Sequence, residues 1–395
     1  MDQFLKTYTS AQHYVNSWRY PVLEKVGVAL KLGVLCVAEI NTTTSVYPAE
    51  DHPDVVLYGI ACRDSTVASS LASTYSFKKS YDSYEDLLAD PDIDFVYISL
   101  PTSLHFEWAQ KALDAGKHVL LEPPITSNAR EAELLVKKSE ECGKVLLEAS
   151  SWQFHPASHR FRQILDSNEF GGIVRTDAAI SSITPVPTDD VRWQYDLSGG
   201  SLISMASVIG LTRYVLHGST PDSILQAAAT ISREEPRVDS SMLATMRFKL
   251  PGIDKRSEQS NVFSTIFTDM ARRPAYGLVP RVWELPSIRV ETDLAEIYFY
   301  NAVTPHIYHY IAITIKETGK TSYESVYQGG PLWKDRGKAF WSADRYQLEA
   351  FVDKIRGRRP VWWIDGEDSV AQMRTVDAIY RASGLPLRPT STMIN

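Results

Sequence analysis

The chain has 395 residues, of which 44% are hydrophobic and 23% charged, and its formal net charge is −7. This length supports two packed domains, and the negative charge argues against a nucleic-acid surface. No apolar run approaches the roughly 18 residues of a membrane span, so we expect no membrane contact. Cys36, Cys62 and Cys142 are sparse and lack metal-type spacing. That usage favours a reducing, cytoplasmic location and no metal site.

Residues 1–29 form an N-terminal extension. Asp2 and Lys6 interrupt any apolar core of a signal peptide there. Apolar residues between Phe4 and Trp18 recur at roughly helical spacing, which favours a helix lying on the body of the protein. A lid or a partner-binding segment is the alternative.

Residues 30–150 alternate short apolar runs with helical patterns, which is typical of a parallel sheet wrapped by helices. The predicted strands are 31–37, 54–62, 94–100, 118–122 and 144–150. Helices are predicted between them at 66–74, 103–116 and 129–143, and the last two end at Gly116 and Gly143. We therefore expect a Rossmann-like domain.

The turn after the first predicted strand departs from the glycine pattern of a dinucleotide site. Such a turn needs glycines because backbone amides must approach the pyrophosphate closely. Gly33 lies within the strand, Cys36 and Ala38 stand where glycines would be favourable, and Glu39 adds a negative charge. Arg63, at the end of the second strand, either pairs with a ribose 2′-phosphate, favouring NADP, or is an ordinary solvated arginine.

From residue 172 the pattern changes to longer, partly alternating runs that predict an antiparallel sheet. The expected strands are 172–183, 241–250, 262–269, 295–302 and 306–316. Helical patterns return at 342–357 and 368–384. Five aromatic residues could form a broad face, covered by the chain's own helices or by a second subunit: Tyr298, Phe299, Tyr300, Tyr308 and Tyr310. We assign residues 151–395 to this substrate and oligomerisation domain.

The order of these segments resembles the glucose–fructose oxidoreductase, inositol dehydrogenase and MocA (Gfo/Idh/MocA) family. The similarity is carried by residues 81–124, 146–165, 169–180, 190–216 and 368–391. It points to a fungal-like branch near the dimeric dihydrodiol and NADP-dependent D-xylose dehydrogenases. The resemblance implies an α/β Rossmann-like domain beside an α+β domain with a large open-faced, mainly antiparallel sheet. Many members form dimers or tetramers through that sheet, so we expect a homodimer.

The resemblance also implies where the family's chemistry should lie, and the sequence departs from the family pattern there. Members usually carry Glu-Lys-Pro after the fourth strand, where this chain has Glu-Pro-Pro at 122–124. Pro123 thus replaces a lysine that lies by the substrate and the nicotinamide and assists proton transfer. The family's Gly-Gly-x-Leu-x-Asp appears at 199–204 with Ser204 at the acid position, and residues 206–208 lack the usual glycine and His or Tyr. A serine hydroxyl is a poor general acid or base unless another group activates it.

The pocket that the resemblance implies lies between the carboxyl ends of the parallel strands and the second sheet. Its candidate catalytic residues are His105, Glu122, His155, Arg192 and Tyr195. Expected substrate contacts come from Pro123, Trp152, Gln153, Trp193, Ser204, Ser207 and Tyr214. A retained dinucleotide would lie near Cys36, Ala38, Ile40, Arg63, Pro101, Thr102, His105 and Glu122. For each histidine a structural role is the alternative, and Glu122 could instead cap or pair within its loop.

Loss of the glycine turn, the lysine, the aspartate and the His or Tyr predicts that hydride transfer by the family mechanism is gone. The intact strand and helix pattern argues against random decay. Because the expected pocket is rich in aromatic residues, it suits a large unsaturated ligand. We therefore predict a non-redox cyclisation or isomerisation of a largely apolar small molecule, in fungal specialised metabolism, with no required cofactor.

Three alternatives stay open. An NAD(P)-dependent oxidoreductase could use substituted acid and base groups, such as His155 or Tyr195. A ligand sensor or regulatory protein would bind without turnover. A non-redox enzyme could still hold NADP as a vestigial or structural ligand, and mass spectrometry of the freshly purified protein would detect it.

Overall fold

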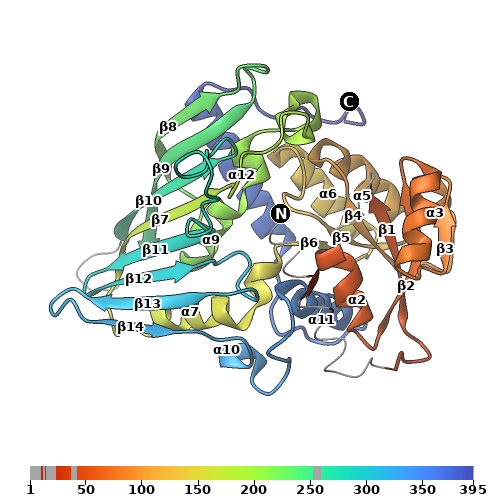
Figure 1. Ribbon diagram of the computed structural model, residues 1–395, viewed down its shortest axis with the longest axis horizontal. Helices are drawn as coiled ribbons and strands as arrows, with labels where there is room; N and C mark the ends of the chain where they lie inside the picture. The colour runs from red at the N-terminus through yellow and green to blue at the C-terminus, as the bar shows by residue number, and fades with distance from the viewer. Residues whose placement is uncertain (1–9, 12–13, 15–23, 37–41, 252–258, 395) are drawn as a thin grey trace.

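The computed structural model describes residues 10–11, 14, 24–36, 42–251 and 259–394. Two sheets stand side by side, one within the N-terminal part of the chain and one formed by residues after 172 (Figure 1). The expected fold class is confirmed. Among the described residues, no helix is both long and apolar enough to cross a membrane.

The first sheet is parallel and has the strand order β3-β2-β1-β4-β5-β6. Its strands are β1 (Leu30–Cys36), β2 (Val55–Cys62), β3 (Lys79–Tyr81), β4 (Phe95–Ser99), β5 (His118–Leu121) and β6 (Leu146–Glu148). A π-helix (Thr42–Val46) precedes the helices α2 (Tyr47–Glu50), α3 (Ser65–Thr74), α4 (Tyr84–Ala89), α5 (His105–Asp114) and α6 (Ala129–Glu141). The order reverses between β1 and β4, and dinucleotides bind in the crevice at such a point.

Local chemistry explains why these elements form. β1, β4 and β5 are buried nearly throughout, as strands covered by helices on both faces must be. The side chains of Asp64, Ser83 and Asn128 accept hydrogen bonds at the N-termini of α3, α4 and α6. Gly33 allows close packing, because a Cβ there would lie 2.9 Å from Leu87 Cδ2 of α4.

The second sheet has eight strands in the order β14-β13-β12-β11-β7-β10-β9-β8, and only the β7–β10 pair among these described strands is parallel. The strands are β7 (Ile173–Ser181), β8 (Ser223–Ile231), β9 (Asp239–Pro251), β10 (Gln259–Asp269), β11 (Ser287–Thr292), β12 (Ala295–Tyr300), β13 (Tyr310–Ile315) and β14 (Thr321–Glu324). β12 alternates strictly between buried and partly exposed residues, which is typical of a sheet with one covered face.

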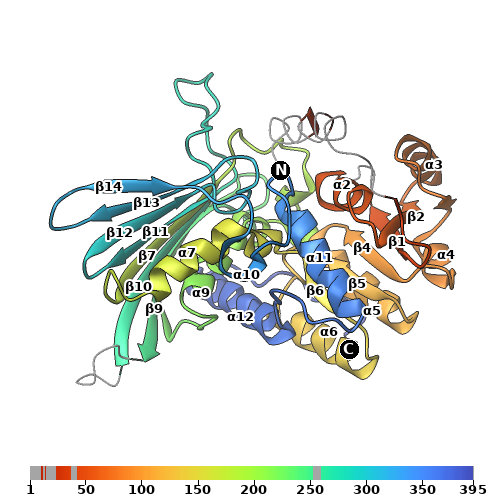
Figure 2. The same ribbon diagram turned by 90° about the horizontal axis from the view of Figure 1, so that it is seen from below.

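Three helices cover one face of this sheet and leave the opposite face open (Figure 2). They are α7 (Pro156–Asp166), α9 (Ser207–Val215) and α12 (Gly366–Ser383). The remaining helices are α8 (Ser201–Ser204), α10 (Gly330–Trp333) and α11 (Ala343–Ile355). α12 also packs against α6, and α11 packs against α2 and the π-helix, so both late helices return to the first domain.

The predicted elements agree with the structure in most places, but the aromatic face needs correcting. Phe299 is 1% exposed and packs on Phe161 of α7, so it belongs to the covered face. Residues 306–309 form a loop rather than the start of a strand. The Asn301 amide donates to the carbonyls of Thr304 and Tyr308, and these bonds keep the segment out of the sheet. The sequence patterns also missed the strands β3, β8, β11 and β14 and the helices α4, α7 and α9.

Most of the N-terminal extension lies outside the described residues. Ser10, Ala11 and Tyr14 are helical, but the predicted helix as a whole stays a prediction. Lys25 ties the end of the extension to the body, because its Nζ donates to the carbonyls of Ala49 and Glu50, at 2.8 Å each, and of His52.

Candidate active site

A cavity of about 940 Å³ lies between the carboxyl ends of the parallel strands and the second sheet. One wall carries Tyr97 of β4 and residues 122–123 and 149–152, which follow β5 and β6. Facing it are residues 180–187 at the end of β7, together with Leu285 and Pro286. Asp344 and Gln347 of α11 also line the cavity. Its volume suffices for a small ligand together with the reactive end of a cofactor.

Glu122 and Tyr97 form a polar pair at one side of the cavity. The Tyr97 hydroxyl donates to Glu122 Oε1 at 2.5 Å and is hydrogen-bonded to Thr44 Oγ1 at 2.8 Å. Thr44 belongs to the π-helix that follows the dinucleotide turn. Burial and the neighbouring Glu122 carboxylate raise the pKa of Tyr97 well above its usual value, so this phenol keeps its proton.

Asp344 is another acidic side chain of the cavity wall, which carries Glu122 and Asp190 as well. It is the second residue of α11, whose first turn is capped by Ser342 Oγ accepting from Arg345 N at 3.1 Å. Burial raises the pKa of Asp344 to about 7, the charge of Glu122 acts in the same direction, and a hydrogen bond from Ser151 opposes both. A carboxyl with such a pKa exchanges its proton at neutral pH.

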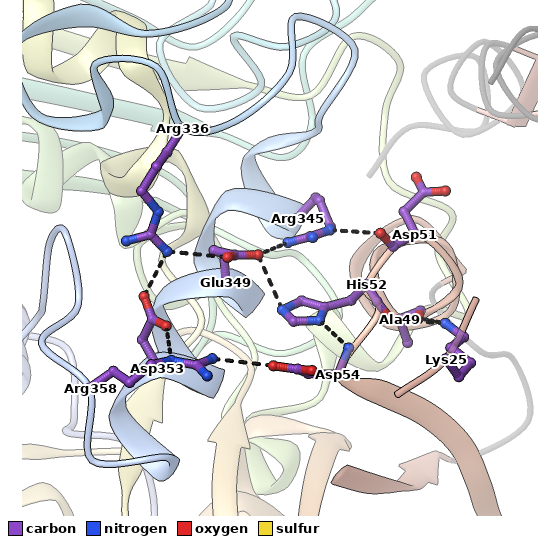
Figure 3. Close-up of polar contacts among 10 residues, drawn as sticks. All are labelled: Lys25, Ala49, Asp51, His52, Asp54, Arg336, Arg345, Glu349, Asp353 and Arg358. Atoms are coloured by element: carbon purple, nitrogen blue, oxygen red, sulfur yellow. Dashed lines mark hydrogen bonds and ion pairs between the residues drawn. The ribbon is translucent and has the colours of Figure 1, made fainter. Parts of the chain in front are cut away.

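Charged side chains fasten α11 to the segment that follows α2 (Figure 3). Arg345 binds Glu349 Oε2 at 2.7 Å through Nη1 and the carbonyl of Asp51 at 3.3 Å through Nε. His52 Nε2 lies 3.2 Å from the same Glu349 oxygen. One turn further, Asp353 is held between Arg336 at 2.8 Å and Arg358 at 2.7 Å. The start of α11 is therefore fixed relative to the parallel sheet.

The described part of the dinucleotide crevice fits NADP. Arg63 is exposed at the carboxyl end of β2, and no described residue forms an ion pair with it, so its guanidinium is available to a 2′-phosphate. The Cys36 side chain is fully buried, with Sγ 3.7 Å from the Ala61 carbonyl. Its side chain is therefore packed against β2 and does not itself fill the crevice.

Other predicted cofactor contacts are only partly described. Pro101 and Thr102 are partly exposed on the loop that follows β4, next to the crevice. Ala38, Ile40 and Glu39 lie outside the described residues.

His105 has a structural position rather than a catalytic one. Its Nε2 lies 2.8 Å from the Leu100 carbonyl and its Nδ1 2.9 Å from the Pro124 carbonyl. The ring is 1% exposed and bridges the loops after β4 and β5, and its burial lowers its pKa. The Pro123–Pro124 peptide bond in the second loop is cis. Pro124 is buried, whereas Pro123 is exposed in the cavity wall.

The predicted residues around the second domain divide into two groups. Arg192, Trp152, Ser204 and Ser207 line the cavity, as do Glu122 and Pro123. Gln153 lines a water-sized recess beside it, which Pro123 and Ser207 share.

Four others are placed elsewhere. His155 is fully buried and caps α7, because its Nδ1 accepts from Ala157 N at 3.2 Å. Tyr195 donates to the Leu387 carbonyl at 2.5 Å, Trp193 donates to the Pro187 carbonyl, and Tyr214 packs behind Trp152 and lies 3.1 Å from His159 Nδ1. His105, His155 and Tyr195 do not line the cavity and make structural contacts, so this geometry does not favour them as catalytic residues, and their catalytic roles stay predictions.

Sequence reasoning missed several side chains of the cavity, among them Tyr97, His306 and Asp344. The polar tip of a tyrosine in an otherwise apolar strand was a usable signal for Tyr97. His306 lies where a strand was expected. Asp344 had no distinguishing signal, because acidic residues are common in the first turn of any helix.

A doubly wound parallel sheet with an acidic cavity at its switch point defines a two-domain, dinucleotide-dependent oxidoreductase scaffold. Comparison with known proteins agrees with this class. The family profile described as "Oxidoreductase family, NAD-binding Rossmann fold" matches residues 33–150. D-xylose 1-dehydrogenase (NADP(+)) 2 of Haloferax volcanii is 31% identical over 358 residues, covering 90% of this chain and 97% of the relative. The chain belongs to the Gfo/Idh/MocA family.

Two further comparisons are consistent with that assignment. Trans-1,2-dihydrobenzene-1,2-diol dehydrogenase of Xenopus tropicalis is 27% identical over 66% of this chain and 76% of the relative. The solved structure of a 3-ketoreductase from Actinomadura kijaniata, in complex with NADP and TDP-benzene, superposes with a TM-score of 0.73 at 22% identity. It covers 90% of this chain and 98% of that one, and at this identity it supports the fold alone.

These findings overturn the functional prediction made from the motifs. The non-redox cyclase or isomerase is wrong, and so are its lack of a cofactor and its link to specialised metabolism, because the family is NAD-binding and the relative that aligns along most of the chain is NADP-dependent. The physical reason is visible in the cavity. Pro123 removes one charged group, but Glu122, Tyr97 and Asp344 still supply acidic and hydroxyl groups there.

Proposed function

We propose that this protein is an NADP-dependent oxidoreductase that interconverts a hydroxyl and a carbonyl group on a small polar molecule. The observation that carries the proposal is the cavity at the strand-order switch, in which Glu122 and Asp344 face a space next to the crevice. Membership of the family supports it, as does the relative that acts on D-xylose.

Residues of this chain have distinct roles in the proposed reaction. Bound NADP+ supplies the hydride acceptor, and NADPH the donor. Arg63 would bind the 2′-phosphate. Tyr97 holds the Glu122 carboxylate in one orientation at 2.5 Å, so a substrate hydroxyl has a fixed acceptor in the cavity. Trp152, Ile183 and Val186 supply apolar parts of the wall.

The test is an absorbance assay for NADPH formation with NADP+ or NAD+ and either D-xylose or trans-1,2-dihydrobenzene-1,2-diol. We expect turnover with NADP+ and little with NAD+. Arg63→Ala should raise the KM for NADP+ about 10-fold or more and leave that for NAD+ unchanged, because a charge-assisted contact is lost. Absence of turnover with both substrates and both cofactors, together with no detectable NADP+ binding, would refute the proposed function.

We also propose that a second copy of the chain covers the open sheet face. Tyr308 and Tyr323 are 57% and 69% exposed there, and Tyr300 stacks on Tyr310 with ring centroids 5.0 Å apart. Arg289 pairs with Glu296 at 2.6 Å, and other charges on this face are similarly paired, so no net charge selects an oppositely charged partner. Sedimentation should give a dimer for the wild type and a monomer for Tyr323→Lys, and a monomeric wild type would contradict the proposal.

The cytoplasm is the proposed compartment. All three cysteines are free thiols, which suits a reducing environment. Fractionation of the source cells tests this, and recovery in a secreted or organellar fraction would contradict it.

A further inference from the structure

We propose that Asp344 is the group that exchanges a proton with the substrate oxygen, in place of the lysine that Pro123 replaces. This inference rests on the proposed oxidoreductase function and assigns a residue to its proton transfer. It is carried by the position of Asp344 in the cavity wall and by the chemistry of its neighbours.

Asp344 differs from the other deeply buried aspartates of the described structure in having no cation. Asp239 pairs with Arg388 at 2.7 Å, and Asp353 pairs with both Arg336 and Arg358. Among the described residues, no lysine, arginine or histidine forms an ion pair with Asp344, although it is only 8% exposed. An unpaired buried carboxylate is costly and is retained where a protein uses it.

The neighbouring side chains that shift the pKa of Asp344 are neutral or negative. Arg192 also lines the cavity, but its guanidinium pairs with Asp190 at 2.8 Å. Glu122 faces it from the loop after β5, and Ser151 hydrogen-bonds it from the segment after β6. His306 Nδ1 accepts from the adjacent Ala343 N at 3.4 Å, and burial lowers the pKa of His306 to about 4, so it is uncharged at neutral pH.

The next residue, Arg345, adds no cation to the cavity. Its guanidinium is committed to Glu349 and to the Asp51 carbonyl, as Figure 3 shows. These surroundings are consistent with a pKa of about 7 for the Asp344 carboxyl.

The other groups in the cavity are less suited to this proton transfer. The Tyr97 hydroxyl already donates to Glu122, and its pKa is raised well above the usual phenol value. Pro123 carries no exchangeable proton, and the hydroxyl of Ser204 is too weak an acid without an activating partner. Asp344 is therefore better suited to this proton transfer than Tyr97, Pro123 or Ser204.

The proton and electrons balance in this assignment. In alcohol oxidation, the carbinol C–H bond breaks and its hydrogen leaves with the electron pair as hydride to the oxidised nicotinamide. The O–H bond breaks, its proton moves to an Asp344 carboxylate oxygen, and a C=O bond forms. In carbonyl reduction, the protonated Asp344 returns that proton to the oxygen as hydride arrives at carbon. The network at Glu349 and Asp353 keeps α11 in place throughout.

The test compares Asp344→Asn with wild type in the NADP+ and D-xylose assay. We expect kcat to fall at least about 100-fold, the usual size of an acid–base contribution, while the dissociation constant of NADP+, measured by fluorescence, changes less than about 2-fold. Asp365→Asn is the matched control, because Asp365 is an exposed aspartate at the N-terminus of α12. That variant should retain wild-type kcat.

A second variant separates proton transfer from a structural role. Ser151→Ala removes a hydrogen bond that lowers the pKa of Asp344, so the inflection of kcat near neutral pH should move to higher pH. Burial also raises the pKa values of Glu148 to about 7 and of Asp377 to about 6, so the readout is the infrared difference between wild type and Asp344→Asn. This difference should contain one protonated carboxyl band that titrates near neutral pH, whatever the activity. If wild type turns over and Asp344→Asn retains its kcat, Asp344 is not the proton-transfer group and the proposed function stands. If wild type binds no NADP+ and oxidises neither substrate, both proposals fail, even if the carboxyl band titrates.

Discussion

Asp344→Asn should make the protein more stable at alkaline pH, although it removes a group that we propose is essential for activity. The pKa of this carboxyl is about 7 in the folded protein, against 3.8 for an unperturbed aspartate. A raised carboxyl pKa favours folding fully below pH 3.8, and the advantage is lost as pH rises through 7. At about 1.4 kcal/mol per pH unit, the buried charge costs about 4 kcal/mol at pH 8 and about 2 kcal/mol at pH 5.

The quantity to measure is the change, from pH 5 to pH 8, in the free energy of unfolding of the variant relative to wild type. Comparing the two pH values cancels effects that do not depend on pH. Burying the new amide costs about the same at both values. The free energy of unfolding from urea titrations of wild type and variant should therefore diverge by about 2–3 kcal/mol more at pH 8 than at pH 5. Asp365→Asn should show no such divergence, since Asp365 is exposed.

Two results would refute this reasoning. An equal difference between variant and wild type at pH 5 and pH 8 would mean that Asp344 is not a buried, unpaired carboxyl. A variant that is less stable than wild type at pH 8 would mean that an unrecognised cation stabilises the carboxylate.

Three further perturbations test other parts of the structure. Pro123→Lys places a cation in the cavity wall, so the inflection of kcat with pH should move about one unit lower. An unchanged pH profile would mean that a charge at position 123 does not act on the Asp344 carboxyl. His306 has a pKa of about 4 against 6.5 when unperturbed. Its contribution to the free energy of unfolding is therefore present above pH 6.5 and falls by about 3 kcal/mol as pH drops through 4. In urea titrations, His306→Gln should lose correspondingly less of its free energy of unfolding on acidification. Arg388→Leu leaves the fully buried Asp239 carboxylate without its cation and should lower the free energy of unfolding by about 3–5 kcal/mol. A loss under about 1 kcal/mol would show that this ion pair contributes little to stability.

The fold could be predicted largely from the sequence because periodicity and glycine stops report backbone conformation directly. Gly116 and Gly143 have φ values of +75° and +60°, the left-handed conformation that ends helices. The strands β3 and β14 were missed because three or four residues carry too little pattern. β3 spans Lys79–Tyr81, and only Tyr81 in it is not exposed.

The candidate site could be predicted where its residues follow a strand of the parallel sheet or lie in a family motif, as Arg192 and Ser204 do. Glu122 and Pro123 directly follow β5 and do line the cavity. Asp344 comes from a helix more than 200 residues later, and no local pattern brings it to the same space. His155 does follow β6, but it caps α7 and its ring is buried. The missing motif residues were over-interpreted, because a lost lysine can be compensated by a side chain from another part of the chain.

The late position of α11 has a consequence for synthesis of the chain. Phe351 of this helix packs on Phe95 of β4, with ring centroids 5.5 Å apart, and Val352 is buried in the same cluster as Leu32 and Val34 of β1. The earliest strands to leave the ribosome therefore keep an uncovered apolar face until residues near 355 follow. A nascent chain that ends at residue 150 would be prone to aggregate, and chaperone contact during translation is expected to last until α11 emerges.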